Sequence, residues 1–270
     1  MKLSIITINK NNAFGLKKTI LSVINQTFSD YEYIIIDGKS SDESINIIKE
    51  NNSKINFWVS ELDSGIYNAM NKGILKAQGE YCLFLNSGDY LISCDTLKTL
   101  FNEIDDNKSD IFYSNRINSD NSITKYPDNI NLKFLVNSPI NHQNSIIKRL
   151  LFIQHGLYNE DLRIASDWEF FLMEYYIYKS NFLKIKTNIS VFDINGIGSR
   201  ISNERLIEND KIIKNVFINC NEISDIIIEY RNNQDNVYFD IINKYGNSNL
   251  LTLLLKIYRK ILFFVKIKNK

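Results

Sequence analysis

Short apolar runs alternate with amphipathic segments through residues 1–90, and this alternation restricts the fold more than any other feature of the sequence. The runs are rich in β-branched and aromatic residues and cover residues 3–8, 31–36, 55–59 and 81–85. Segments that begin near residues 14, 42 and 65 place apolar residues at helical spacing. Strands that are apolar throughout and alternate with helices form a parallel sheet covered on both faces. The sequence therefore predicts an α/β fold.

Beyond residue 90 the alternation is less regular. Helices are predicted at residues 96–104 and 168–178, and strands at 110–114, 122–126, 145–148 and 182–194. From residue 201 onward the pattern favours helices. We therefore predict one domain over residues 1–200, with halves 1–90 and 91–200, and a helical C-terminal extension over residues 201–270.

Polar residues follow the predicted strands at the points where the strands end. Asn9 ends the first strand, Asp37 follows the second, and Asp63 lies between the third strand and a helix. The fourth strand is followed by Asn-Ser-Gly-Asp at residues 86–89. Ligands bind at the carboxyl ends of the strands in an open parallel sheet, where such residues meet. We therefore expect these residues to form one binding site.

Each of these residues also has a structural explanation that the sequence leaves open. Asp42 and Asp63 can cap helices, Gly38 can serve a tight turn, and residues 86–89 can form an ordinary polar turn. Their coincidence at one sheet edge favours a binding site. Neither GxGxxG nor GxxxxGK(S/T) occurs, so a dinucleotide site and a P-loop lack their main support.

Several stretches resemble a known family. They are residues 4–7 (SIIT), 36–42 (IDGKSSD), 60–91 (SELDSGIYNAMNKGILKAQGEYCLFLNSGDYL), 141–143 (NHQ) and 165–169 (ASDWE). Together they resemble the inverting glycosyltransferases of family 2, which have the GT-A fold. The long block is similar to bacterial exopolysaccharide and O-antigen transferases of the colanic-acid type. The resemblance implies a mostly parallel central sheet flanked by helices.

The resemblance also implies roles on the donor side. Thr7 lines the nucleotide pocket, Asp37 binds the base of a nucleoside diphosphate, usually uracil, and Asp63 approaches the nucleotide and the donor sugar. An ionised carboxylate can accept the imide N–H of uracil. Asn86 and Asp89 occupy the place of the family's DxD signature and are expected to contact the donor.

The signature departs from the family pattern, because Asn86 and Gly88 stand where acids are common. Asp89 is the one carboxylate left there. A Mn²⁺ or Mg²⁺ ion would bridge the diphosphate oxygens and neutralise the charge of the leaving group. Such ions often use only one or two protein carboxylates. We therefore expect Asp89 to bind the metal, with metal independence as the alternative.

The acceptor side is implied by the later stretches. Asp167 matches the catalytic base, which takes the proton of the acceptor hydroxyl as that hydroxyl attacks the anomeric carbon. The alternative role for Asp167 is the N-cap of a helix starting at Trp168, and both roles can hold together. His142 is expected to face the diphosphate or the acceptor, with a structural role as the alternative.

The expected reaction is the transfer of a hexosyl or N-acetylhexosaminyl group from a UDP-sugar. Its acceptor would be a lipid-linked saccharide of a lipopolysaccharide or capsule. Two alternatives stay open. A catalytically inactive nucleotide-sugar-binding module is suggested by Asn86 and Gly88. A nucleotidyltransferase would need a phosphate loop after the first strand, and residues 9–15 make a poor one.

The charge distribution separates the last residues from the rest. The formal net charge is +1, so no global field favours nucleic acid as a partner. Residues 250–270 alternate apolar clusters with basic residues and contain no acid, as in a helix lying on an anionic membrane. A terminal helix packed on the domain is the alternative. Because no signal peptide or apolar span of ~20 residues is found, we expect a cytoplasmic protein held on the inner face of the cell membrane by residues 248–270.

Overall fold

The computed structural model describes residues 1–104, 107–138, 140–194, 203–218, 224–225, 227–228 and 231. Within these residues, seven strands form the central sheet in the order β10-β6-β9-β4-β1-β2-β3. They are β1 (Leu3–Asn9), β2 (Tyr31–Asp37), β3 (Phe57–Ser60), β4 (Tyr81–Phe84), β6 (Ile111–Tyr113), β9 (Ser145–Lys148) and β10 (Phe182–Lys184). Only β9 runs antiparallel to its neighbours in this sheet, β4 and β6. The predicted α/β fold with a mostly parallel sheet is confirmed.

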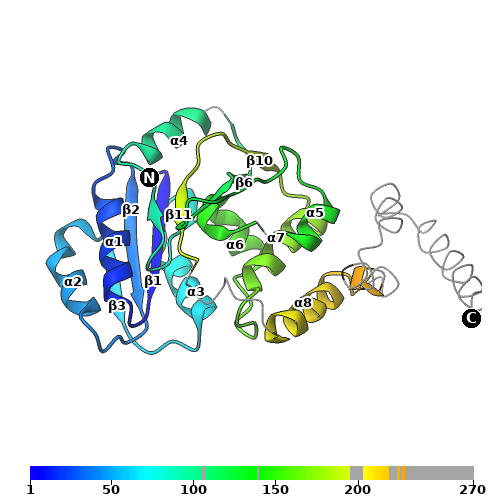
Figure 1. Cartoon of the computed structure of the whole chain (residues 1–270), viewed down its shortest axis with the longest axis horizontal. Helices are drawn as coiled ribbons and strands as arrows, with labels where there is room; N and C mark the ends of the chain where they lie inside the picture. Colours follow the sequence, from blue (N-terminus) through cyan, green and yellow to red (C-terminus); the bar gives the residue numbers. More distant parts are fainter. Residues whose placement is uncertain are drawn as a thin grey trace, which may run out of the picture. The chain divides into compact units, whose positions relative to one another are not determined.

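Helices cover both faces of this sheet. They include α1 (Ala13–Ile24), α2 (Ser44–Glu50), α3 (Ile66–Lys76) and α4 (Thr96–Ile104), and α1 and α2 lie along β1 to β3 (Figure 1). Odd-numbered strand residues such as Ile5 and Tyr33 share one core cluster with residues of α1 and α4. On the opposite face, Gly73 of α3 lies against Ile6. Alternation along each strand thus assigns its residues to one helical layer or the other.

A smaller sheet in the order β5-β11-β7-β8 lies beside the loop after β4. Its strands are β5 (Tyr90–Leu91), β7 (Arg116–Asn118), β8 (Ile123–Thr124) and β11 (Ser190–Phe192). The predicted strand over residues 182–194 is therefore wrong, because β10 and β11 belong to different sheets. The chain leaves the first sheet where the backbone N–H groups of Lys186 and Thr187 donate to the Glu103 carboxylate instead of to a strand.

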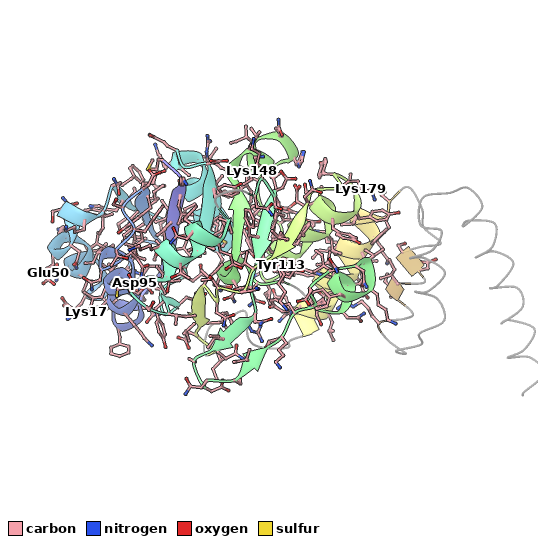
Figure 2. The ribbon with its side chains drawn as sticks, turned by 90° about the horizontal axis from the view of Figure 1, so that it is seen from above. Lys17, Glu50, Asp95, Tyr113, Lys148 and Lys179 are labelled. Carbon is pink, nitrogen blue, oxygen red and sulfur yellow. The ribbon has the colours of Figure 1, made fainter. Side chains whose placement is uncertain are left out.

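Two further helices complete this part of the fold. Helix α6 (Arg149–His155) follows β9, and α7 (Ser166–Tyr176) precedes β10. Seen from above, Tyr113 of β6 lies inside the domain, whereas Lys17 of α1 and Glu50 of α2 lie at its surface (Figure 2), in agreement with their burial.

The chain divides into two compact units. The second takes in residues 131–139 and 201–270, so a short segment of the predicted first domain belongs with the C-terminal extension. Its described elements include α5 (Leu132–Asn137), capped by the side chain of Asn131, and α8 (Asn203–Val216). No helix in the described part of the chain is long and apolar enough to cross a membrane. Residues 248–270, predicted to contact the membrane, lie outside the described residues.

Candidate active site

The ends of β1 and β2 bring two of the predicted residues together. Asn9 and Asp37 are register partners, and Asn9 Nδ2 donates to Asp37 Oδ1 at 2.7 Å. Asp37 is fully buried and also accepts hydrogen bonds from the backbone N–H and hydroxyl of Ser40 and from the hydroxyl of Ser60. These four donors hold the carboxylate in a fixed orientation at the sheet edge. Its role in binding a base stays a prediction.

Thr7 lies inside the sheet rather than at its edge. Its side chain is fully buried, and its hydroxyl is 3.1 Å from the hydroxyl of Tyr33. Thr7 is an odd-numbered residue of β1 and therefore lies on the same face as Ile5, which packs on α1. The nucleotide-lining role of Thr7 has no support from this position and stays a prediction.

Asp63 joins the same edge from the loop before α3. Its carboxylate lies against Gly38, because a Cβ atom at Gly38 would be only 2.6 Å from Asp63 Oδ2. Burial raises the pKa of Asp63, while the charges of Lys10 and Lys72 oppose this rise. The close approach explains why residue 38 is a glycine, since any side chain there would displace Asp63.

Residues 86–89 form a tight turn after β4. Gly88 has a φ of +112°, and the N–H of Asp89 donates to the carbonyl of Asn86 at 2.9 Å. The Asp89 carboxylate accepts from the backbone N–H of Asn86 at 3.2 Å and from that of Asp193 at 2.9 Å. Only 3% of Asp89 is exposed, and burial raises its pKa to about 6. Through these two hydrogen bonds Asp89 links the turn to Asp193, the residue that follows β11.

Asp193 is a site residue that the sequence analysis missed. A Cβ atom at Gly88 would lie 2.8 Å from Asp193 Oδ2, so the Asp193 carboxylate occupies the space beside the residue that lacks a side chain. Nothing in the local sequence marks this position, because the contact depends on β11 leaving the first sheet. The described residues contain no group of three or more His, Cys, Asp or Glu residues placed to hold a metal ion.

Asp167 and His142 form a hydrogen-bonded pair. His142 Nδ1 lies 2.7 Å from Asp167 Oδ2, and both side chains are largely buried, with 9% and 16% exposed. Asp167 Oδ1 accepts from the hydroxyl of Tyr67 and from the backbone N–H of Trp168, both at 3.0 Å. Burial alone would raise the pKa of Asp167, but the hydrogen bonds from His142 and Tyr67 outweigh it and lower the pKa. The carboxylate is therefore ionised at neutral pH.

The N-cap explanation of Asp167 is wrong, because α7 begins at Ser166 and Ala165 is its N-cap residue. Asp167 lies in the first turn of the helix, where an acidic side chain is favoured by the helix dipole. Tyr67 is a further residue that the sequence analysis missed. It belongs to α3, and its hydroxyl also lies 2.7 Å from the carbonyl oxygen of Ile164, so its single proton is shared between that oxygen and Asp167 Oδ1.

Asn86 connects the turn after β4 to this pair. Its Nδ2 atom lies 3.2 Å from His142 Nε2. Asn86 Oδ1 accepts no hydrogen bond from any residue that the structure describes. The arrangement therefore places an ionised carboxylate, an imidazole and an amide in sequence, beside the turn that carries Asp89 and Asp193. It can accept a proton from a hydroxyl at one end and contact polar groups of a ligand at the other.

Comparisons with known proteins identify the family and the fold of the chain. The family model described as "Glycosyl transferase family 2" matches residues 4–165. The PGL/p-HBAD biosynthesis glycosyltransferase Rv2957 of Mycobacterium tuberculosis is 33% identical over 172 residues, which are 62% of this chain and 67% of that protein. Residues 1–349 of Staphylococcus aureus TarS, solved with UDP, match with a TM-score of 0.68 and 22% identity over 87% of this chain and 71% of TarS. The mannosyltransferase PcManGT of Pyrobaculum calidifontis, solved with GDP-Man and Mn²⁺, matches with a TM-score of 0.61 and 14% identity over 97% of this chain and 80% of that chain.

Proposed function

The chain belongs to glycosyl transferase family 2, and on that premise we propose a specific reaction for it. The protein transfers a hexosyl or N-acetylhexosaminyl group from a UDP-sugar to a hydroxyl group of a lipid-linked surface saccharide. The transfer inverts the configuration at the anomeric carbon. The observation that carries this proposal is the environment of Asp167.

Asp167 has the properties of a general base. Its hydrogen bonds stabilise the ionised form of the carboxylate. They use both lone pairs of Oδ1 and one lone pair of Oδ2. A carboxylate offers about four acceptor positions, so one position on Oδ2 is left for an acceptor hydroxyl. In the proposed step Asp167 takes the hydroxyl proton, the oxygen bonds to the anomeric carbon, and the nucleoside diphosphate leaves from the opposite face. One carboxylate suffices for this single displacement.

The donor would occupy the sheet edge formed by the ends of β1 and β2 and by the turn at residues 86–89. Asp37 would bind the base and Asp63 would approach the nucleotide and the donor sugar. Because four donors already occupy the acceptor positions of Asp37, a base would have to displace one of them, such as the hydroxyl of Ser60. Asn86 Oδ1, which accepts no hydrogen bond from the described residues, would contact the donor. UDP as the carrier is supported by the complex of TarS with UDP, because TarS has the same fold.

Two carboxylates at the turn of residues 86–89, those of Asp89 and Asp193, are the type of ligand that Mn²⁺ or Mg²⁺ would use there. The lack of a side chain at Gly88 lets the Asp193 carboxylate approach the turn, next to Asp89, whose buried carboxylate already accepts two backbone N–H groups. We therefore propose that Asp193 holds the ion together with Asp89, with diphosphate oxygens and water as the remaining ligands. When bound, the ion neutralises the charge that develops on the leaving diphosphate. The Mn²⁺ complex of PcManGT supports metal use in this fold.

The acceptor and the location are proposed from the sequence. Residues 60–91 resemble exopolysaccharide and O-antigen transferases of the colanic-acid type, which favours a growing lipopolysaccharide or capsule chain. The basic and apolar residues at 250–270 favour attachment to the inner face of the cell membrane, where a lipid-linked acceptor would lie.

Incubation with a panel of UDP-sugars, Mn²⁺ and a lipid-linked acceptor tests the proposal. We expect UDP release that depends on the acceptor, and NMR of the product from an α-linked donor should give a β linkage. Binding of UDP without release from any donor would favour the inactive binding module instead. An α-linked product would contradict the single displacement.

A further inference from the structure

We propose that Asn86 positions the base through His142, by holding the imidazole in the tautomer that carries its proton on Nδ1. This inference rests on the proposed function, because it takes Asp167 as the base. It gives Asn86, which replaces an acid of the signature, a task on the acceptor side of the reaction.

Asn86, His142 and Asp167 come from distant parts of the chain and form a series of hydrogen-bonded side chains, here called the relay. Asn86 follows β4, His142 begins the short 3-10 helix at His142–Asn144, and Asp167 lies in the first turn of α7. Asn86 and His142 are separated by 56 residues, and His142 and Asp167 by 25. The two contacts, at 3.2 Å and 2.7 Å, use the two different nitrogens of one imidazole ring.

The chemistry of the three groups fixes the tautomer. The ionised Asp167 carboxylate only accepts hydrogen bonds, so Nδ1 must carry a proton. In the neutral ring Nε2 is then an acceptor, which matches the N–H donor that Asn86 Nδ2 offers it. An aspartate at position 86 could only accept, so it would require a second proton on Nε2. The amide can therefore pair with the neutral ring, whereas an acid would need the imidazolium.

Packing keeps the ring in place. Only 7% of His142 is exposed, and its ring meets the fully buried Phe84 edge-on, with centroids 6.2 Å apart. The ring cannot turn without breaking contacts with both Asn86 and Asp167. His142 is thus a positioning residue that aims the remaining lone pair of Asp167 Oδ2 at the acceptor.

The ring tautomer can be measured without any sugar transfer. The chain has two histidines, so ¹⁵N signals of His142 are identified in the full-length protein by their loss in His142→Asn. We expect a protonated Nδ1 and an unprotonated Nε2 at neutral pH. In Asn86→Asp at the same pH, both nitrogens should be protonated. A wild-type ring protonated at Nε2, or a ring unchanged in Asn86→Asp, would overturn the proposal.

Two substitutions of His142 separate positioning from folding. Asparagine places its amide nitrogen near the position of Nδ1 and can keep the bond to Asp167, whereas glutamine reaches toward Nε2 and can keep only the bond to Asn86. We expect His142→Gln to lower kcat by ~10²-fold, the lower end of what general-base catalysis supplies, and His142→Asn to lower it less. UDP affinity should stay within about threefold in both, because the relay acts on the acceptor side.

Equal losses of kcat in the two variants, in proportion to their losses in thermal stability, would overturn the positioning role. If the wild-type protein transfers no sugar from any donor, the proposed function fails. The ¹⁵N measurement would still decide whether Asn86 sets the tautomer, so the two failures are distinguishable.

Discussion

His142 Nδ1 lies 2.7 Å from Asp167 Oδ2, and this contact joins the segment before β9 to the first turn of α7. It places the carboxylate that we assign as the base in a buried, fully defined position. The same ring touches Asn86 of the turn after β4. The donor and acceptor halves of the proposed site therefore share one imidazole.

The space beside Gly88 can be tested with two matched substitutions. Gly88 and Gly156 both have a φ of +112°, which disfavours a side chain, but only at Gly88 would a Cβ atom meet another residue, Asp193. We expect Gly156→Ala to lower the free energy of unfolding by about 1–3 kcal/mol, and Gly88→Ala to lower it further, because its Cβ would also displace Asp193. Urea unfolding measures this loss. Only Gly88→Ala should also weaken Mn²⁺-dependent binding of UDP, and an equal effect of both on UDP binding would contradict the proposed place of the diphosphate.

Asp193→Asn should weaken Mn²⁺ binding in the presence of UDP. The substitution removes the negative charge of the Asp193 carboxylate, which lies beside Gly88 in the proposed metal site. Calorimetry with and without Mn²⁺ measures this directly. Asp161→Asn, at an exposed residue of the same unit, is the control and should bind like the wild type. Full transferase activity in EDTA would show that the reaction needs no divalent ion, and the role of Asp193 would then be wrong.

Stability should depend on pH with opposite signs at two buried acids. The folded state lowers the pKa of Asp167, so its carboxylate stabilises the fold above about pH 4 and loses this effect as the pH falls through the lowered value. Burial raises the pKa of Glu174, so its contribution is lost as the pH rises through the raised value. The stability advantage of wild type over Asp167→Asn should grow as the pH rises from about 2 to about 5 and then level off, whereas that over Glu174→Gln should shrink as the pH rises from about 4 to 7. Urea unfolding across this range checks both slopes, and slopes of the same sign would contradict the account.

Deletion of residues 248–270 should release the protein from membranes. The basic residues there would bind anionic lipid by charge, so binding of the full chain to anionic liposomes should weaken as salt increases. Transfer to a soluble acceptor analogue should survive the deletion. A truncated protein that unfolds would mean that these residues belong to the core instead.

The sequence allowed the central sheet to be predicted because β1, β2 and β4 are predominantly apolar. Such runs mark strands buried on both faces, and their polar ends mark the ligand edge, where Asn9 and Asp37 do meet. The burial of Thr7 also follows from alternation along β1, since it shares a face with Leu3 and Ile5.

The remaining features depend on contacts between distant segments. Strands β5 and β11 have two and three residues, and they pair across about a hundred positions, so no local pattern marks them. The position of Asp193 beside Gly88 follows from that pairing. The bond between His142 and Asp167 likewise depends on β9 entering the sheet antiparallel to β4 and β6.

The central claim is that Asp167 is the general base, and kcat of Asp167→Asn at saturating donor and acceptor tests it most directly. Asparagine keeps the size of the side chain but cannot take the proton of the acceptor hydroxyl. Loss of general-base catalysis predicts a fall in kcat of ~10²–10⁴-fold, in a protein that still folds and binds UDP as the wild type does. A variant that keeps near-normal kcat would contradict the account and leave Asp167 as a structural residue of α7.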